Sequence, residues 1–166
     1  MADTPHPAAT PEDARRLAAS FADGLSRRED AYTPESLEQA DDSVSGYHRM
    51  VGLGMLDARM KEAARDVAER AGCYLGEVIV RNLGGRWVPA ADTAYARLPN
   101  AAGFPLVVEL PNGHCCNPLA RPFKLLEHGR EGESMAGFYA GLASLAQEPG
   151  QPPPPPPRRP WWRFWG

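Results

Sequence analysis

Six consecutive prolines at residues 152–157 divide this 166-residue chain into a foldable body and a short C-terminal tail. Proline lacks a backbone N–H and its ring fixes φ, so the run forms neither a helix interior nor a central strand. It forms an extended polyproline helix instead, a stiff spacer of roughly 19 Å at about 3.1 Å per residue. We therefore predict a disordered lead-in at residues 1–9, one domain at residues 10–148 and a proline-linked tail at residues 149–166.

The tail beyond the prolines combines cationic and aromatic side chains. Arginine and aromatic residues dominate the energetics of protein interfaces, and the same composition resembles tryptophan- and arginine-rich membrane-active peptides. Three interpretations stay open: docking into a groove of a partner protein, association with an anionic membrane surface, or folding back onto the chain's own acidic helices. The predicted partner-binding residues are Arg158, Arg159, Trp161, Trp162, Arg163, Phe164 and Trp165.

Charge is unevenly distributed along the chain, whose net charge is −3. The acidic residues concentrate before residue 46, and the last sixteen residues contain arginines but no acid. No basic stripe marks the body, so we expect no nucleic-acid partner there. The chain has no apolar run of about 20 residues and no basic, apolar leader, and its three cysteines suit a reducing compartment. These features predict a cytoplasmic protein, with peripheral contact at the inner membrane surface left open.

Capping signals predict two helices in the N-terminal part of the chain. Thr10 precedes Pro11 and two acids, and Thr33 repeats this arrangement before a second apolar period. A longer helix is predicted from about Met55 to Leu83, ended by the glycine pair that follows. Its second half, GCYLGEVIV, is also rich in strand formers, but the helical period continues through it without a turn signal. Gly72 and Gly76 share one face of this helix and would let another backbone cross closely, within the chain or in a second copy.

Beyond the glycine pair, the pattern changes to short strands. Residues 86–88 and 105–110 are rich in strand-forming residues, and PNG at residues 111–113 is a hairpin turn into a strand at residues 114–116. Two helices follow, at about residues 123–127 and 134–147. The sequence thus predicts an α+β fold: N-terminal helices, a small antiparallel sheet, C-terminal helices and a disordered Pro/Trp-rich tail.

Three segments, AGCYLGEVIVRNLGGRW, LPNGHCCNPLARPFKLLEHG and SMAGFYAGL, carry a resemblance. They resemble a group of uncharacterised bacterial domains of unknown function that have a Y-L-G-E-V helix, a downstream G-x-W, an N-P segment and a closing F-Y helix. The resemblance covers roughly residues 33–145 and implies a compact bacterial α+β unit without an assigned chemistry. It singles out, with no role attached, Tyr74, Gly76, Glu77, Trp87, Asn117, Pro118 and Tyr139.

Glu77 is the one carboxylate in the apolar stretch of the long helix. A buried carboxylate with a raised pKa is a candidate general base. Arg81 follows one turn later, at the spacing of an i, i+4 ion pair. We therefore predict that Glu77 and Arg81 form a structural pair, with the catalytic role as the alternative.

The segment His114-Cys115-Cys116 offers a second set of reactive side chains. Strand alternation places His114 and Cys116 on one face and Cys115 on the other, so a metal would find two ligands here and need others from elsewhere. No spacing typical of a zinc site, a phosphate loop or a nucleophile elbow is present. We predict no metal, no cofactor and no catalytic residue.

Taken together, the residues favour a non-enzymatic interaction or adaptor protein that presents a C-terminal aromatic and cationic motif on a polyproline arm. One alternative is a small enzyme that uses Glu77 with His114 or with Cys115 and Cys116. Another is a regulatory or immunity-type protein that binds an effector through the acidic helices of residues 10–45.

Overall fold

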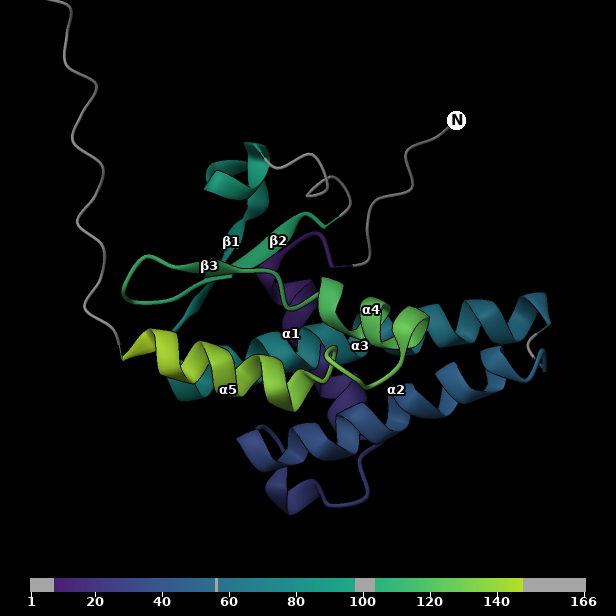
Figure 1. Cartoon of the computed structure of the whole chain (residues 1–166). Helices are drawn as coiled ribbons and strands as arrows, with labels where there is room; N and C mark the ends of the chain where they lie inside the picture. The colour runs from purple at the N-terminus through teal and green to yellow at the C-terminus, as the bar shows by residue number, and fades with distance from the viewer. Residues whose placement is uncertain (1–7, 56, 98–103, 148–166) are drawn as a thin grey trace, which may run out of the picture.

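The computed structural model describes residues 8–55, 57–97 and 104–147, which form an α+β fold (Figure 1). Five α-helices and a three-stranded antiparallel sheet follow each other in the predicted order of helices, sheet and helices. Ala8 is fully buried and joins the core two residues before the predicted start of the domain. The tail, with every predicted partner-binding residue, lies outside the described residues.

The first two helices begin where the capping signals predict. In α1 (Pro11–Ala22), the Thr10 side chain accepts a hydrogen bond from the backbone N–H of Asp13. Thr33 caps a short 3-10 turn (Pro34–Ser36) in the same way, and α2 (Leu37–Gly52) continues directly from it. Each cap satisfies a backbone donor that has no partner within its own helix.

The long helix α3 (Ala58–Leu83) is the centre of the fold and packs against α1, α2, α4, α5 and the sheet. Its second half is helical, as the apolar period predicts, and residues 71–79 are all buried, because neighbours cover it on every side. It ends at Gly84, whose φ of 72° is the left-handed conformation typical of a helix terminus. Its start differs from the prediction: Asp57 accepts from the N–H of Met60 and caps the helix, so it begins three residues after Met55.

The glycine face of α3 lets two other segments approach closely. A Cβ on Gly72 would lie 2.8 Å from the Cα of Leu119, so the backbone before α4 crosses α3 here. A Cβ on Gly76 would lie 2.1 Å from the indole of Trp87, so this glycine makes room for the tryptophan. The glycine face therefore serves packing within the chain.

The sheet consists of β1 (Arg86–Pro89), β2 (Leu106–Glu109) and β3 (Cys115–Cys116), in that spatial order. Its register aligns Trp87, Val108 and Cys116, which are buried, whereas Cys115 on the opposite face is partly exposed. The predicted hairpin turn between β2 and β3 contains Gly113 at a φ of 84°. Three further 3-10 turns span Arg28–Asp30, Ala90–Asp92 and Ala94–Arg97.

The last two helices, α4 (Ala120–His128) and α5 (Met135–Ala146), lie along α3 and complete the core. Leu125 of α4 and Met135 of α5 are fully buried and belong to the hydrophobic core. In Figure 1, the sheet lies toward one end of α3, and the junction of α2 and α3 forms the opposite end. The fold thus has a sheet end and a helical-hairpin end.

Candidate functional site

Glu77 lies on the buried face of α3 and is 3% exposed. Its Oε1 accepts a hydrogen bond of 2.9 Å from Nε1 of Trp87, and its Oε2 accepts one of 3.3 Å from Nε of Arg81. Nε of Arg15 lies 3.8 Å from Oε1. The i, i+4 contact between Glu77 and Arg81 is present as the spacing predicts, and α1 and β1 each add a partner. We call these four residues the Glu77 cluster.

The Glu77 cluster joins a helix to the sheet because Gly76 leaves space for the Trp87 ring directly beside the carboxylate. A buried carboxylate needs donors, and here the Trp87 indole and the Arg81 guanidinium donate hydrogen bonds, while Arg15 adds a longer ion pair. Arg15 and Arg81 keep 62% and 50% of their side chains exposed, so water solvates both cations. With its oxygens engaged this way, Glu77 serves as an anchor between elements.

Tyr32 extends this region and has an unusual backbone. Its φ of 66° is a conformation that non-glycine residues adopt rarely. Its N–H donates to Oη of Tyr74 over 2.8 Å, and its carbonyl accepts from Nδ2 of Asn82 over 2.8 Å. Arg81 stacks over its ring at 3.5 Å, and burial raises the pKa of its hydroxyl. Three residues of α3 therefore contact the N–H, the carbonyl and the ring of this strained residue.

Asp41 is a second buried carboxylate, which the sequence analysis did not single out. Its Oδ1 accepts a hydrogen bond of 2.7 Å from the N–H of Met135, and its Oδ2 accepts one of 3.2 Å from the N–H of Ala136. Burial raises the pKa of Asp41, and these hydrogen bonds oppose that shift. The carboxylate thus binds the amino end of α5 and fixes it on α2.

A sequence signal for Asp41 does exist. It lies four residues after Leu37 and three before Val44, so it falls within the apolar stripe that predicts the buried face of α2. A carboxylate in such a stripe requires buried donors. The stripe alone does not identify them, because they lie more than 90 residues further along the chain.

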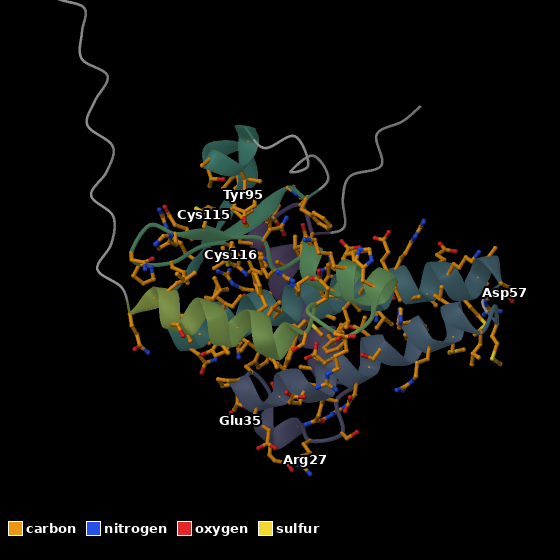
Figure 2. All side chains as sticks on the ribbon, viewed as in Figure 1. Arg27, Glu35, Asp57, Tyr95, Cys115 and Cys116 are labelled. Atoms are coloured by element: carbon orange, nitrogen blue, oxygen red, sulfur yellow. The ribbon has the colours of Figure 1, made fainter. Side chains whose placement is uncertain are left out.

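The cysteines do not form a nucleophilic site in the described part of the chain. Burial raises the pKa of Cys73 and Cys116 to about 12, and it also raises the pKa of Cys115. Nucleophilic thiols require the opposite shift, toward the thiolate. Nearby Tyr95 also has a pKa raised by burial, so it too keeps its proton (Figure 2).

The groups of the enzyme alternative lie on different elements. Glu77 contacts Trp87 on β1, whereas Cys115 and Cys116 lie on β3, with β2 between the two strands. The backbone N–H of His114 donates to Oδ1 of Asn112, in the turn that leads into β3. Among the described residues, no hydrogen bond or ion pair joins Glu77 to His114, Cys115 or Cys116.

Residues 8–55, 57–97 and 104–147 contain no group of three His, Cys, Asp or Glu side chains that could hold a metal ion. In the same residues, no helix is long and apolar enough to cross a membrane. The acidic helices of the immunity-type alternative are partly neutralised, since Arg130 forms ion pairs with both Glu38 and Asp42 on α2.

An open groove of about 330 Å³ lies between α2, α3 and α4, toward the helical-hairpin end. It is lined by Val51, Lys61, Ala64, Arg65, Phe123, Leu126 and Glu127. A smaller hollow of about 190 Å³ lies between α1, α2 and α3. The larger groove has a mainly apolar lining with two cations and one anion, Glu127, a composition that suits binding more than proton-transfer chemistry.

No protein-family model, curated protein or solved structure matches this chain. The resemblance to uncharacterised bacterial domains therefore stays a prediction. The residues that it singles out nevertheless include a packing unit of the fold, since Gly76, Glu77 and Trp87 contact one another.

Proposed function

We propose that this protein is a bacterial, cytoplasmic interaction or adaptor protein, which binds a protein partner through the aromatic and cationic motif at residues 158–165. One observation carries the proposal: three of the four tryptophans follow a six-proline spacer, together with three arginines. Indole rings supply large, rigid apolar areas at interfaces, and arginine adds directed hydrogen bonds. In this proposal, the prolines act as a stiff spacer between the motif and the body.

The described body is consistent with binding rather than catalysis. Glu77, the candidate general base, is engaged by an indole and two guanidinium groups. The thiols have raised pKa values and lie on other elements than the partners of Glu77. These contacts give the candidate reactive groups packing roles and support the idea that the body acts as a scaffold.

Partner capture tests the proposal. The intact chain is compared with a chain in which Trp161, Trp162 and Trp165 are replaced by Ala, and a synthetic peptide of residues 152–166 serves as competitor. We expect the intact chain to retain a partner that the peptide displaces and that the triple variant does not retain. Replacing Arg158, Arg159 and Arg163 by Gln should weaken binding in a graded, salt-dependent way, since exposed charges act over a screened range.

The matched control lies on the acidic helices. Glu35 and Glu38 are exposed, and their replacement by Gln should leave capture unchanged. Capture that is lost in this control and kept in the tryptophan variant would reject the tail and favour the acidic helices. Truncation after Gln151 should change the free energy of unfolding by no more than about 0.5 kcal/mol. A drop of many degrees in melting temperature would instead mean that the tail packs on its own body.

A further inference from the structure

The turn between α2 and α3 presents apolar side chains to solvent at the helical-hairpin end. We define the hairpin tip as residues 51–55, with the sequence VGLGM. Val51 is 46% exposed, Leu53 is 73% exposed and Met55 is 60% exposed. Single exposed apolar residues are ordinary, but three within five residues form a cluster that core packing does not explain.

The backbone of the hairpin tip is closed by its own hydrogen bonds. Leu53 donates to the carbonyl of Arg49, Gly54 donates to Val51, and Met55 donates to Met50. Gly54 has a φ of 66°, which suits glycine. Because backbone bonds and glycine set this shape, the exposed side chains of Leu53 and Met55 are left available for another surface.

Four exposed cations flank the hairpin tip in the sequence. Arg49, Arg59, Lys61 and Arg65 are all exposed, and none forms an ion pair with another residue of the described chain. Residues 49–65 contain these four cations and two acids, a net charge of +2 in a chain whose total is −3. One of the acids, Asp57, is engaged as the cap of α3. The hairpin end is thus cationic on an acidic protein.

The groove between α2, α3 and α4 continues this surface. Val51 belongs to both the hairpin tip and the groove, whose apolar lining then runs to Phe123 and Leu126. Lys61 and Arg65 line the same groove, so the apolar surface and the cations lie next to each other. Figure 2 places Asp57 at the extreme end of the molecule, far from Cys115 and Cys116, so the tip is a protrusion.

We propose that the hairpin tip and its flanking cations dock on an anionic lipid surface. A protruding apolar turn enters the boundary between headgroups and acyl chains, while cations at its base remain at the level of the lipid phosphates. Each of these cations strengthens attachment to an anionic leaflet about fivefold. The groove then lies beside the membrane, with its apolar lining facing the lipid and Lys61 and Arg65 facing the headgroups. Glu127, the one anion of the lining, lies 3.7 Å from Nε2 of His128. This surface shares no residue with the motif at residues 158–165, so either proposal stands without the other.

Vesicle sedimentation tests the docking site in the full-length chain with Trp161, Trp162 and Trp165 replaced by Ala, which removes the indoles of the tail. We expect binding to vesicles of phosphatidylglycerol and phosphatidylcholine, and at least tenfold weaker binding to phosphatidylcholine alone. Adding Leu53→Ser and Met55→Ser should weaken binding to the anionic vesicles tenfold or more, since two apolar side chains lose their burial. Arg59→Gln with Lys61→Gln should weaken it about 25-fold and reduce its salt dependence, because two of the four cations at this end are removed.

Leu145→Ser is the matched control, because Leu145 is 40% exposed on α5, at the other end of the molecule. It should leave vesicle binding unchanged. An equal loss in this control, or no loss in the hairpin-tip variants, would overturn the proposal and leave a protein partner as the occupant of the tip.

A fluorescence measurement reports insertion directly. In the same background the remaining native tryptophan is Trp87, which is 7% exposed, so Leu53→Trp adds a reporter at the tip. We expect a blue shift and quenching by brominated lipid on anionic vesicles, with no change for the background chain that retains Trp87 alone. An unshifted spectrum from the Leu53→Trp chain on anionic vesicles would overturn the proposal.

Discussion

In the described residues, two carboxylates are buried, and different kinds of partner stabilise them. Glu77, between α3 and the sheet, has cations and an indole as partners, and its two arginines are at least half exposed. Asp41, between α2 and α5, has backbone N–H groups at the start of a helix as its partners, and Met135 beside it is fully buried. When Glu77 is lost, its two cations can return to water and the indole N–H of Trp87 is the one buried donor left without its acceptor, whereas both partners of Asp41 are backbone N–H groups at the packed start of α5. Equal burial therefore does not imply equal importance for stability.

The largest effect should come from Asp41→Ala. This change leaves the N–H groups of Met135 and Ala136 without their acceptor and unties the start of α5 from α2. Because buried donors lose their acceptor and two hydrogen bonds to a carboxylate are removed, we expect the free energy of unfolding to fall by about 3 kcal/mol. Urea denaturation measures this loss. Asp42→Ala is the matched control, because Asp42 is exposed and pairs with Arg130 at the surface. It should cost less than about 1 kcal/mol, and equal losses would contradict the comparison.

A smaller effect is expected from Glu77→Gln, about 1 to 3 kcal/mol. Glutamine keeps the shape and an acceptor for Trp87 but removes the charge that attracts Arg81 and Arg15. Urea denaturation measures the loss, and partner capture through the tail should be unchanged. Full stability together with the loss of an enzymatic activity would reject the structural role and restore the enzyme alternative.

The same comparison shows which features the sequence could reveal. Local features could be predicted from the sequence. Thr10 and Thr33 predict the caps that they form, and Gly84 predicts the end of α3. The spacing of Glu77 and Arg81 predicts their contact. Contacts between residues far apart in the sequence could not be predicted. The donors to Asp41 are set by how α5 packs on α2, which depends on the whole fold.

The exposed hairpin tip could not be predicted for a different reason. The apolar stripe of the long helix starts at Leu56, so the sequence predicts that this helix begins at about Met55. Asp57 instead caps α3, and this leaves Leu53 and Met55 in an exposed turn. A capping residue inside an apolar run is therefore a stronger boundary signal than the period itself.

Arg15→Gln should have a smaller effect still. Nε of Arg15 is 3.8 Å from Glu77, and its side chain is 62% exposed. Exposed ion pairs contribute about 0.2 to 1 kcal/mol, and salt screens them, so we expect a loss within that range that shrinks at high ionic strength. Urea denaturation at low and high salt measures both. A loss as large as that of Glu77→Gln would mean that Arg15 is the main partner of this carboxylate.

The smallest effect should be the dependence of stability on the ionisation of Asp41, because burial raises its pKa while the N–H groups of Met135 and Ala136 oppose the shift. The folded chain then holds this proton more tightly than the unfolded chain. The contribution of Asp41 to the free energy of unfolding therefore falls as pH rises from the ordinary value of 3.8 through the raised pKa, and is level above it.

Asp13 acts in the opposite direction, since Arg16 and Thr10 lower its pKa, so the wild-type curve alone mixes the two contributions. Subtracting the pH curve of Asp41→Asn from that of the wild type cancels Asp13 and leaves Asp41, provided both are measured by urea denaturation between pH 3 and pH 7. We expect a difference that declines above about pH 4 and then flattens. A difference that rises with pH would mean that the helix N–H groups outweigh burial at Asp41.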